Sequence, residues 1–182
     1  MVTRDTDVES AGDSLKGRHI VLGVTGGIAA VETVKLAREL RRYGAELTVI
    51  MTPSAQRIIT PIAVRWASQA EVITDWDGDL SALNQADAVL VAPATRDVIA
   101  SHLHGLQHGP LMMALSVARS RKTPIMMIPS MHEDLASDPV TQELVDGLVA
   151  PLLAISIVFT LISIFYVTIT IGSHEWESRY VE

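Results

Sequence analysis

Short apolar runs alternate with longer amphipathic segments along most of the chain. Four runs of mainly aliphatic residues predict buried strands over residues 19–24, 45–51, 88–92 and 124–128. Apolar positions at helical spacing predict helices over residues 28–43, 53–59, 61–68, 97–103, 110–118 and 138–148. Continuous apolar strands that alternate with helices are typical of a parallel sheet with helices on both faces. The pattern therefore predicts an α/β fold of three layers.

Capping residues support the first and the last of these helices. Gly44 follows the helix over residues 28–43, and a glycine at this place ends a helix without steric cost. Asp138 precedes Pro139, which is the order expected of an N-cap followed by the first helical residue. The last helix is therefore expected to begin at this pair and to run over residues 138–148.

Glycine, hydroxyl and small residues gather where the four predicted strands end. The segments concerned are residues 25–27, 51–54, 92–95 and 128–131. In open parallel sheets the ligand lies beyond the carboxyl ends of the strands. The composition of these segments therefore predicts a polar ligand that backbone atoms approach closely.

The first of these segments is the best candidate for binding an anion. Gly26, Gly27 and Ile28 open a helix, where free backbone N–H groups and the small size of glycine favour a phosphate. Thr52 and Ser54 either donate hydrogen bonds to the same phosphate or cap a helix of their own. The segment lacks both the spacing of a dinucleotide-binding loop and the lysine of a Walker loop, so a plain strand–helix turn is the alternative.

One segment near the end of the chain breaks the alternation. Residues 147–173 contain no Asp, Glu, Lys, Arg or His over 27 positions. As a helix, residues 149–171 would span roughly 34 Å, enough for a bilayer core of about 30 Å. This predicts one transmembrane helix, with Tyr166 and Trp176 at the interface. The alternatives are a pair of buried strands or an oligomer core, and a chimeric or frame-shifted end.

These patterns divide the chain into four parts. Residues 1–17 are polar and lack an apolar core, which predicts a disordered lead-in rather than a secretory signal. Residues 18–148 form the predicted α/β domain, residues 149–171 the membrane helix and residues 172–182 a polar tail. Basic residues beside the apolar run are too few for the positive-inside rule to orient it.

Charge and cysteine content exclude several classes of function. The net charge of −7 argues against nucleic acid as the main partner, because proteins that bind a phosphate backbone carry a basic patch. Cysteine is absent from the sequence. Disulfides, thiolate nucleophiles and cysteine-ligated metal centres are therefore excluded within these 182 residues.

Two groups of residues have a spacing that resembles metal ligands. His102, His104 and His108 lack an acidic fourth ligand nearby, so polar histidines on a helix or loop are the preferred interpretation. Asp75 and Asp77, with Asp79, match only the start of a calcium loop, because the rest of that pattern does not follow. No metal site is predicted.

Several segments match one known family in the same order along the chain. They are KGRHIVLGVTGGIAAVETVKLARELRRYGAELTVIMTPSAQRIITP from residue 16, ADAVLVAPAT (86–95), PIMMIPSMHE (124–133) and DPVTQEL (138–144). Together they resemble the flavin-dependent cysteine decarboxylase family, and within it the phosphopantothenoylcysteine decarboxylases of the archaeal type. The similarity covers roughly residues 16–148.

The resemblance implies a flavodoxin-like α/β fold that binds FMN and assembles as a trimer or a multiple of trimers. The flavin of the family lies near a subunit interface. Cofactor contacts are implied at the phosphate loop, at the hydroxyls near the phosphate and ribityl chain, at the flavin loop and at the methionine of the P-A-M motif. The matching positions are, in that order, Gly26, Gly27 and Ile28; Thr52 and Ser54; Pro93, Ala94 and Thr95; and Met131.

Substrate-side positions depart from the family pattern. Asp79 stands where the family has a histidine, and an ionised carboxylate would repel a substrate carboxylate rather than act as a neutral base. Asp97 replaces an asparagine that contacts the substrate in the family. His132, in the P-A-M-N motif, is a mild departure shared with archaeal members, whereas the cysteine of the family's substrate clamp is missing.

The sequence therefore predicts a membrane-anchored FMN flavoprotein with its domain in the cytoplasm and with redox or altered decarboxylase chemistry. One alternative is a working phosphopantothenoylcysteine decarboxylase of coenzyme A biosynthesis. Another is a non-catalytic flavin-binding subunit that serves assembly. A soluble cytoplasmic protein is the alternative location, and the small-molecule substrate or electron donor is not identified by the sequence.

Overall fold

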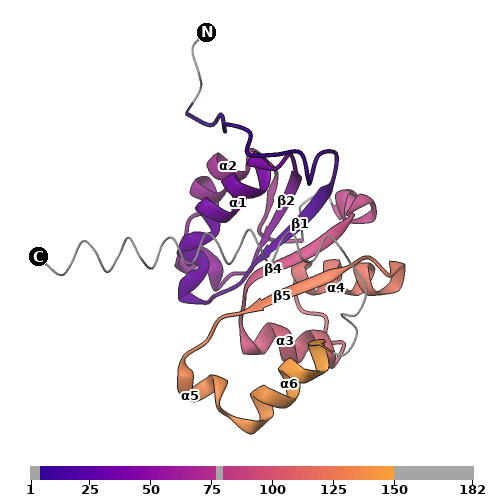
Figure 1. Cartoon of the computed structure of the whole chain (residues 1–182). Coiled ribbons are helices and arrows are strands. Elements are labelled where there is room, and N and C mark those ends of the chain that lie inside the picture. Colours follow the sequence, from indigo (N-terminus) through magenta and orange to yellow (C-terminus); the bar gives the residue numbers. More distant parts are fainter. Residues whose placement is uncertain (1–4, 77–79, 150–182) are drawn as a thin grey trace, which may run out of the picture. The chain divides into compact units, whose positions relative to one another are not determined.

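Five parallel strands form one sheet in the order β3-β2-β1-β4-β5 (Figure 1). The computed structural model of the chain describes residues 5–76 and 80–149. Within them the strands are β1 (His19–Val24), β2 (Glu46–Met51), β3 (Val72–Ile73), β4 (Ala88–Ala94) and β5 (Ile125–Pro129). All neighbouring pairs in the sheet run parallel.

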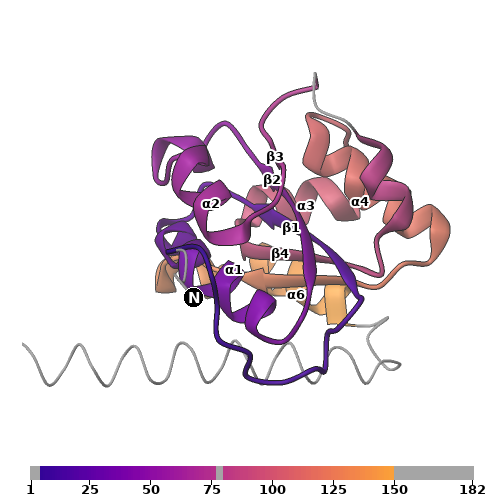
Figure 2. The same cartoon turned by 90° about the horizontal axis from the view of Figure 1, so that it is seen from above.

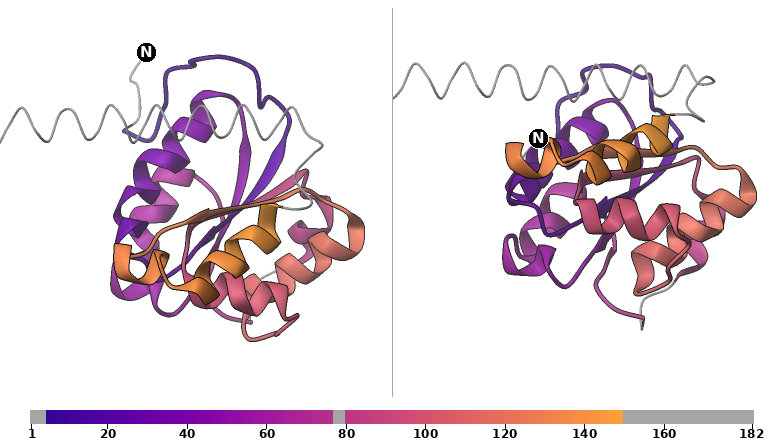
Figure 3. Two further views of the ribbon diagram at one scale, coloured as in Figure 1. Left: turned by 60° about the horizontal axis from the view of Figure 1, so that its bottom comes forward. Right: turned by 90° about the horizontal axis from the view of Figure 1, so that it is seen from below.

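Helices cover both faces of the sheet. The helices of the described residues are α1 (Thr33–Arg42), α2 (Pro61–Ser68), α3 (Arg96–Leu103), α4 (Pro110–Arg121), α5 (Glu133–Ala136) and α6 (Pro139–Val149). Short 3₁₀ turns are η1 (Ile28–Glu32), η2 (Ala55–Arg57) and η3 (Leu80–Gln85). Helices α1 and α2 pack together on one side of the strands and α4 lies on the other (Figure 2). Helix α6 packs along α3 (Figure 3).

The strand order reverses beside β1. From β1 the chain continues outward through β2 and β3, and it then returns to β4 on the opposite side of β1. This doubly wound order is shared with dinucleotide-binding folds, whose ligands bind where the order reverses. The predicted flavodoxin-like fold is confirmed in its three layers and its parallel sheet, while the order of the strands is the one found in dinucleotide-binding folds.

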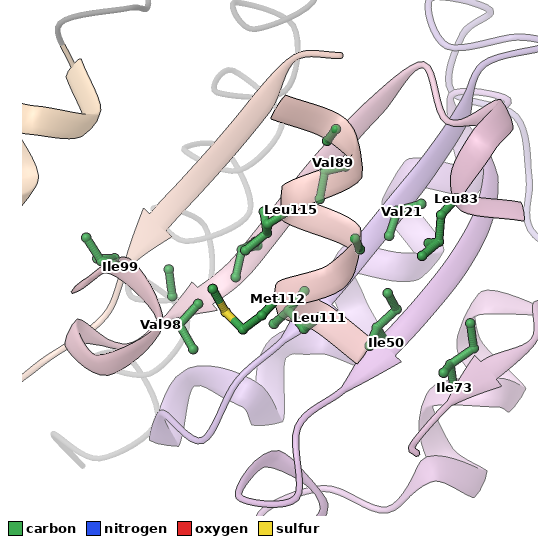
Figure 4. Close-up of a cluster of buried hydrophobic side chains, with 14 residues drawn as sticks. Val21, Ile50, Ile73, Leu83, Val89, Val98, Ile99, Leu111, Met112 and Leu115 are labelled. Atoms are coloured by element: carbon green, nitrogen blue, oxygen red, sulfur yellow. The ribbon is translucent and has the colours of Figure 1, made fainter. Parts of the chain in front are cut away.

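Strand β1 is buried on both faces, as its unbroken apolar sequence predicts. Val21 belongs to a cluster of buried side chains beneath α4, which contributes Leu115 (Figure 4). Successive side chains of a strand point to opposite faces, so Leu22 faces the other layer. There α1 buries Leu36 and Leu40. Two separate apolar layers, one on each face, therefore hold the sheet.

Most predicted elements are found, and the differences have local causes. The predicted helix over residues 53–59 is only the single turn η2, because the extended backbone of Thr60 before Pro61 ends it. The helix predicted from Ile28 begins as η1, with a tight bond from the N–H of Ala30 to the carbonyl of Gly27 at 2.9 Å. Strand β3 and helix α5 were not predicted.

The capping residues of the first and last helices act as expected. Gly44 follows α1 with a φ of +89°, a left-handed conformation that favours glycine. The carboxylate of Asp138 accepts a hydrogen bond from the N–H of Val140 at 3.3 Å. It also forms an ion pair with Arg96 at 2.7 Å, so the start of α6 is tied to the start of α3.

The N-terminal segment from residue 5 has a defined path along α1. Arg41 donates to the carbonyl of Thr6 at 3.0 Å, and Arg42 donates to that of Glu9 at 3.1 Å. Leu15 is only 1% exposed. The sequence predicted a disordered lead-in over residues 1–17, and the described part of it differs because arginines of α1 satisfy its backbone carbonyls.

The predicted membrane helix over residues 149–171 lies outside the described residues, except for Val149 at the end of α6. Over residues 5–76 and 80–149, every helix is too short or too polar to cross a bilayer.

Candidate functional site

A cavity of about 330 Å³ opens beside the carboxyl ends of β1 and β4, where the strand order reverses. Five of the residues singled out in the sequence line it: Gly26, Thr52, Ser54, Thr95 and Asp97. They come from the loops after β1, β2 and β4 and from the first turn of α3. The fold therefore brings together positions that are up to 71 residues apart in the sequence.

Gly26 is required by the close approach of two loops. A Cβ atom at this position would lie 2.4 Å from the Cβ of Ser54 and 3.3 Å from its backbone carbonyl carbon. Gly27 is less constrained, because a Cβ there would meet Pro93 at 3.5 Å and the hydroxyl of Ser130 at 3.6 Å, both ordinary contacts. The loops after β1 and β2 thus form a narrow cradle at one end of the cavity.

Thr25 holds the loop after β1 against the end of β4. Its buried hydroxyl donates to the carbonyl of Pro93 at 2.7 Å and accepts from the N–H of Thr95 at 3.1 Å. The N–H of Ser130 donates to the carbonyl of Ala94 at 3.0 Å and joins the loop after β5 to the same group. Three strand ends are therefore fixed to one another by hydrogen bonds.

The hydroxyls at the cavity differ in the hydrogen bonds that they already make within the protein. The Oγ1 of Thr52 accepts a hydrogen bond from the N–H of Ala55, the first residue of η2, at 3.3 Å. A hydroxyl that accepts one bond still has its own proton to donate. Thr95 is the N-cap residue of α3, but its side chain makes no capping bond. Both hydroxyls can therefore donate to an oxygen of a ligand.

Other predicted cofactor residues lie around the cavity rather than in its wall. Pro93 and Ala94 are buried at the end of β4, and Gly27 lies against Pro93. The side chain of Ile28 is 78% exposed. The roles assigned to these residues stay predictions.

Met131 and His132 belong to a different part of the molecule. Met131 lines a second cleft, of about 490 Å³, together with residues of α6. Here Thr141 is 2% exposed, and its hydroxyl has no hydrogen-bond partner among the described residues. The side chain of His132 is 80% exposed and caps α5, with its Nδ1 accepting from the N–H of Asp134 at 3.3 Å. Asp79 lies outside the described residues.

Several cavity residues were not assigned to the site from the sequence. His108 lines the cavity from the loop between α3 and α4, while Val98, Leu111 and Met112 form its apolar wall. Leu111 and Met112 are also part of the buried cluster in Figure 4. The sequence predicted only the helices that carry them, and the structure shows that the same side chains belong to both the core and the cavity wall.

The charged groups near the cavity are sparse. Among the described residues that line it, Asp97 and His108 are titratable, and none is lysine or arginine. On α3, burial lowers the pKa of His102, and the nearby guanidinium of Arg119 lowers it further. Within the described residues no three histidine, aspartate or glutamate side chains are grouped as a metal would require.

The fold and this cavity define a doubly wound α/β protein with a ligand site at the switch point of its sheet. Residues 8–176 match the flavoprotein family, and the chain belongs to that family. Membership confirms the resemblance found in the sequence and the expectation of a flavin cofactor.

The relatives agree with this assignment. The coenzyme A biosynthesis bifunctional protein CoaBC of Thermococcus kodakarensis is 39% identical over 141 residues, which cover 74% of this chain. The chain spans about a third of the length of the curated relatives that it matches, 35% in this case.

Solved structures share the fold. The FMN-dependent cysteine decarboxylase TvaF from thioviridamide biosynthesis superposes with a TM-score of 0.68 at 24% identity, over 85% of this chain and 97% of that one. A PPC decarboxylase in complex with pantothenoylaminoethenethiol has a TM-score of 0.63 at 18% identity, over 72% and 76% of the two chains.

Proposed function

We propose that this chain is an FMN-binding flavoprotein with decarboxylase-like redox chemistry. The observation that carries the proposal is the cradle at the end of β1, where Gly26 lies too close to Ser54 to tolerate a side chain. Family membership and the CoaBC relatives support a flavin at this place. The FMN-dependent decarboxylases of the same fold support FMN in particular.

The residues present suit a phosphorylated flavin. Backbone N–H groups of Gly26, Gly27 and Ile28 would face the phosphate, with the hydroxyls of Thr52 and Ser54 beside it. The loop of Pro93, Ala94 and Thr95 would lie along the flavin, and Met131 is proposed for the family's methionine contact. The apolar wall of the cavity suits the ring system.

Bound FMN would supply a two-electron acceptor for oxidation of a substrate thiol. The substrate-side residues of this chain would alter the acid–base steps after that oxidation. Asp97 is exposed at the cavity and offers a carboxylate, which accepts hydrogen bonds and repels an anionic substrate group. With Asp79 in place of a histidine, we propose either an electron-transfer role or a decarboxylation with changed acid–base groups.

Two other accounts of the same site remain in competition. One is a working phosphopantothenoylcysteine decarboxylase in coenzyme A synthesis, supported by the CoaBC relatives. The other is a non-catalytic flavin-binding subunit, which the substitutions at Asp79 and Asp97 favour. His132, exposed at the start of α5, is a substrate contact only in the catalytic accounts.

We also propose that the chain forms a homo-oligomer, a trimer or a multiple of trimers. Large apolar side chains are exposed on the single chain near the site and on α2, among them Ile28 (78%), Val31 (51%) and Ile62 (79%). Exposed apolar groups of this size are typical of interaction surfaces.

Residues 149–171 are proposed as a single membrane anchor, with the flavin domain in the cytoplasm. Their length and lack of charge support it. The family match runs to residue 176 and so includes this segment, which is the reason to keep buried strands as the competing account.

A spectrum of the protein purified in detergent and mixed with FMN tests the proposal directly. Flavin absorbance that stays with the protein through gel filtration is expected, and its absence would refute all three functional accounts. Release of carbon dioxide from phosphopantothenoylcysteine then separates the working decarboxylase from the other two. A gain of this activity in Asp79→His combined with Asp97→Asn would show that these two positions alter the chemistry.

A further inference from the structure

The cavity at the switch point is poor in positive charge. Of the described residues that line it, only His108 can become a cation. A phosphate monoester carries close to two negative charges at neutral pH. Hydroxyls and backbone N–H groups can satisfy its oxygens, but they do not balance its charge.

His108 is held in the cavity wall by a buried neighbour. Its Nε2 lies 3.5 Å from the hydroxyl of Ser101, a residue of α3 that is only 2% exposed. The chain then passes through Gly109, whose φ of +90° turns it into the first residue of α4, Pro110. The imidazole therefore stands between two helices and borders the cavity, although it remains accessible to solvent.

The charged groups around His108 are few. Asp97 of α3 lines the same cavity and repels a phosphate. His104 lies on the same loop but does not line the cavity. The guanidinium of Arg119 on α4 is turned to the carbonyl of His102, to which it donates at 2.9 Å. The loop after β2 presents only uncharged groups to the cavity.

We propose that His108 is the cationic contact of the FMN phosphate and that it makes cofactor binding depend on pH. The inference rests on the proposed function, because it places the phosphate of FMN in this cavity. Histidine ordinarily changes its charge between pH 5 and 8. A protonated imidazole attracts the phosphate and a neutral one does not, so FMN binds more tightly as the pH falls from 8.0 to 6.5.

Fluorescence titration of the full chain with FMN at pH 8.0 and pH 6.5 measures this dependence. Both values lie above the phosphate pKa of about 6, so the phosphate remains largely doubly charged. For the unaltered protein we expect the Kd to fall about fivefold between the two values, from a single attraction across a partly hydrated cavity. His108→Gln should bind FMN with a Kd that hardly changes, because a glutamine amide keeps a nitrogen for Ser101 but never becomes charged.

His104→Gln is the matched control, since it removes a histidine of the same loop outside the cavity wall; it should behave like the unaltered protein. Riboflavin, which lacks the phosphate, should bind with no dependence on pH or on His108. The proposal is overturned if His108→Gln keeps the full pH dependence, or if riboflavin shows the same dependence as FMN. Failure of the unaltered protein to bind FMN at either pH would refute the proposed function as well.

Discussion

At the scale of single residues, the site depends on Thr25, which lines the cavity next to Gly26 and is almost completely buried. Its hydroxyl takes the place of water for two backbone groups: it donates to the carbonyl of Pro93 and accepts from the N–H of Thr95. Because Thr25 is 1% exposed, water has little access to these partners if the hydroxyl is removed. One buried hydroxyl in the cavity wall thus fixes the ends of β1 and β4 to each other.

Thr25→Val should therefore destabilise the fold and loosen the loop after β4. Leaving buried polar groups without partners costs about 1–3 kcal/mol each, and we expect a loss of about 2–3 kcal/mol in the free energy of unfolding. Denaturant titration measures this loss. Thr25→Ser keeps the hydroxyl and is the control; equal stability of the two variants would show that the bridge is unimportant.

Sequence reasoning could predict that the ends of β1 and β4 meet, but not that Thr25 joins them. The apolar runs that identify the strands are local, and the topology rule places their carboxyl ends at one edge. The bridge links residues about 70 positions apart and leaves no periodic signal. His108 was missed for the same reason, since a loop histidine gains a role only from the helix beside it.

The second prediction concerns Gly26, in the cradle formed by the loops after β1 and β2. Gly26→Ala places a methyl group 2.4 Å from the Cβ of Ser54, with backbone also close, so one of the two loops must move. Overpacking of this kind costs about 1–3 kcal/mol, and we expect a rise of about 5- to 150-fold in the Kd for FMN. Flavin fluorescence titration measures it.

Gly27→Ala is the matched control for this change. A methyl group there meets Pro93 and Ser130 only at ordinary contact distances, and the backbone of Gly27 is extended. FMN binding should change by less than about threefold. If both alanine variants bind FMN equally well, the close approach at Gly26 does not shape the site.

The carboxylate of Asp87, at the end of the sheet opposite the cavity, makes the stability of the fold depend on pH. The backbone N–H of His19, at 2.8 Å, and the guanidinium of Arg18, at 3.0 Å, lower its pKa. A carboxylate whose pKa is lower in the folded state stabilises the fold at pH values above its unfolded-state pKa of about 3.9. This added stability is lost as the pH falls through the folded-state pKa.

Asp87→Asn should consequently have a lower Tm than the unaltered protein at pH 7, and the difference should close as the pH falls below about 4. Thermal unfolding followed by circular dichroism across pH 3–7 gives the comparison. Asp13→Asn is the control, because the Asp13 side chain is 74% exposed and lies 4.0 Å from Lys16. A constant difference across this range would contradict the assignment.

At the scale of secondary structure, the sequence predicts long elements well and short ones poorly. The bounds of β1 and α2 agree with the structure, because a β-branched run and a proline after an extended threonine are strong local signals. Strand β3 is only Val72–Ile73, too short for any periodicity, and it is added to the sheet by pairing with β2. Helix α5 is a single turn held by the cap at His132.

Helix α1 shows how an element acquires a role that its pattern does not reveal. Its last turn carries Arg41 and Arg42, whose positive charges suit the helix dipole. In the structure Arg41 donates to the carbonyl of Thr6 and, at 2.9 Å, to that of Ala67 in α2. One side chain therefore binds the N-terminal segment to two helices.

Arg41→Ala should release this N-terminal segment. We expect faster cleavage after Glu9 by a glutamate-specific protease, severalfold in rate, and a loss of about 1 kcal/mol in the free energy of unfolding. Mass spectrometry of the early fragments identifies the cut. Arg65→Ala, at an exposed position of α2, is the control and should be cut at the original rate; unchanged cleavage in Arg41→Ala would contradict this role.

At the scale of the whole molecule, charge and apolar character are distributed unequally. The chain carries a net charge of −7, yet the proposed ligand of its cavity is an anion. Local N–H groups and one histidine would have to overcome this overall repulsion, which makes FMN binding sensitive to salt. The excess of apolar residues instead lies in residues 149–171, of which the structure describes only Val149.

A charge in the middle of this apolar segment tests whether it anchors the protein. An aspartate at the centre of a membrane helix costs roughly 3 kcal/mol on the insertion scale, so Val158→Asp combined with Leu161→Asp should abolish co-flotation with lipid vesicles. Val181→Asp, in the polar tail, should float like the unaltered chain. If the doubly substituted protein still floats, the membrane anchor is refuted. The segment is instead part of a buried core if the unaltered chain does not float and the doubly substituted chain loses both its FMN and its fold.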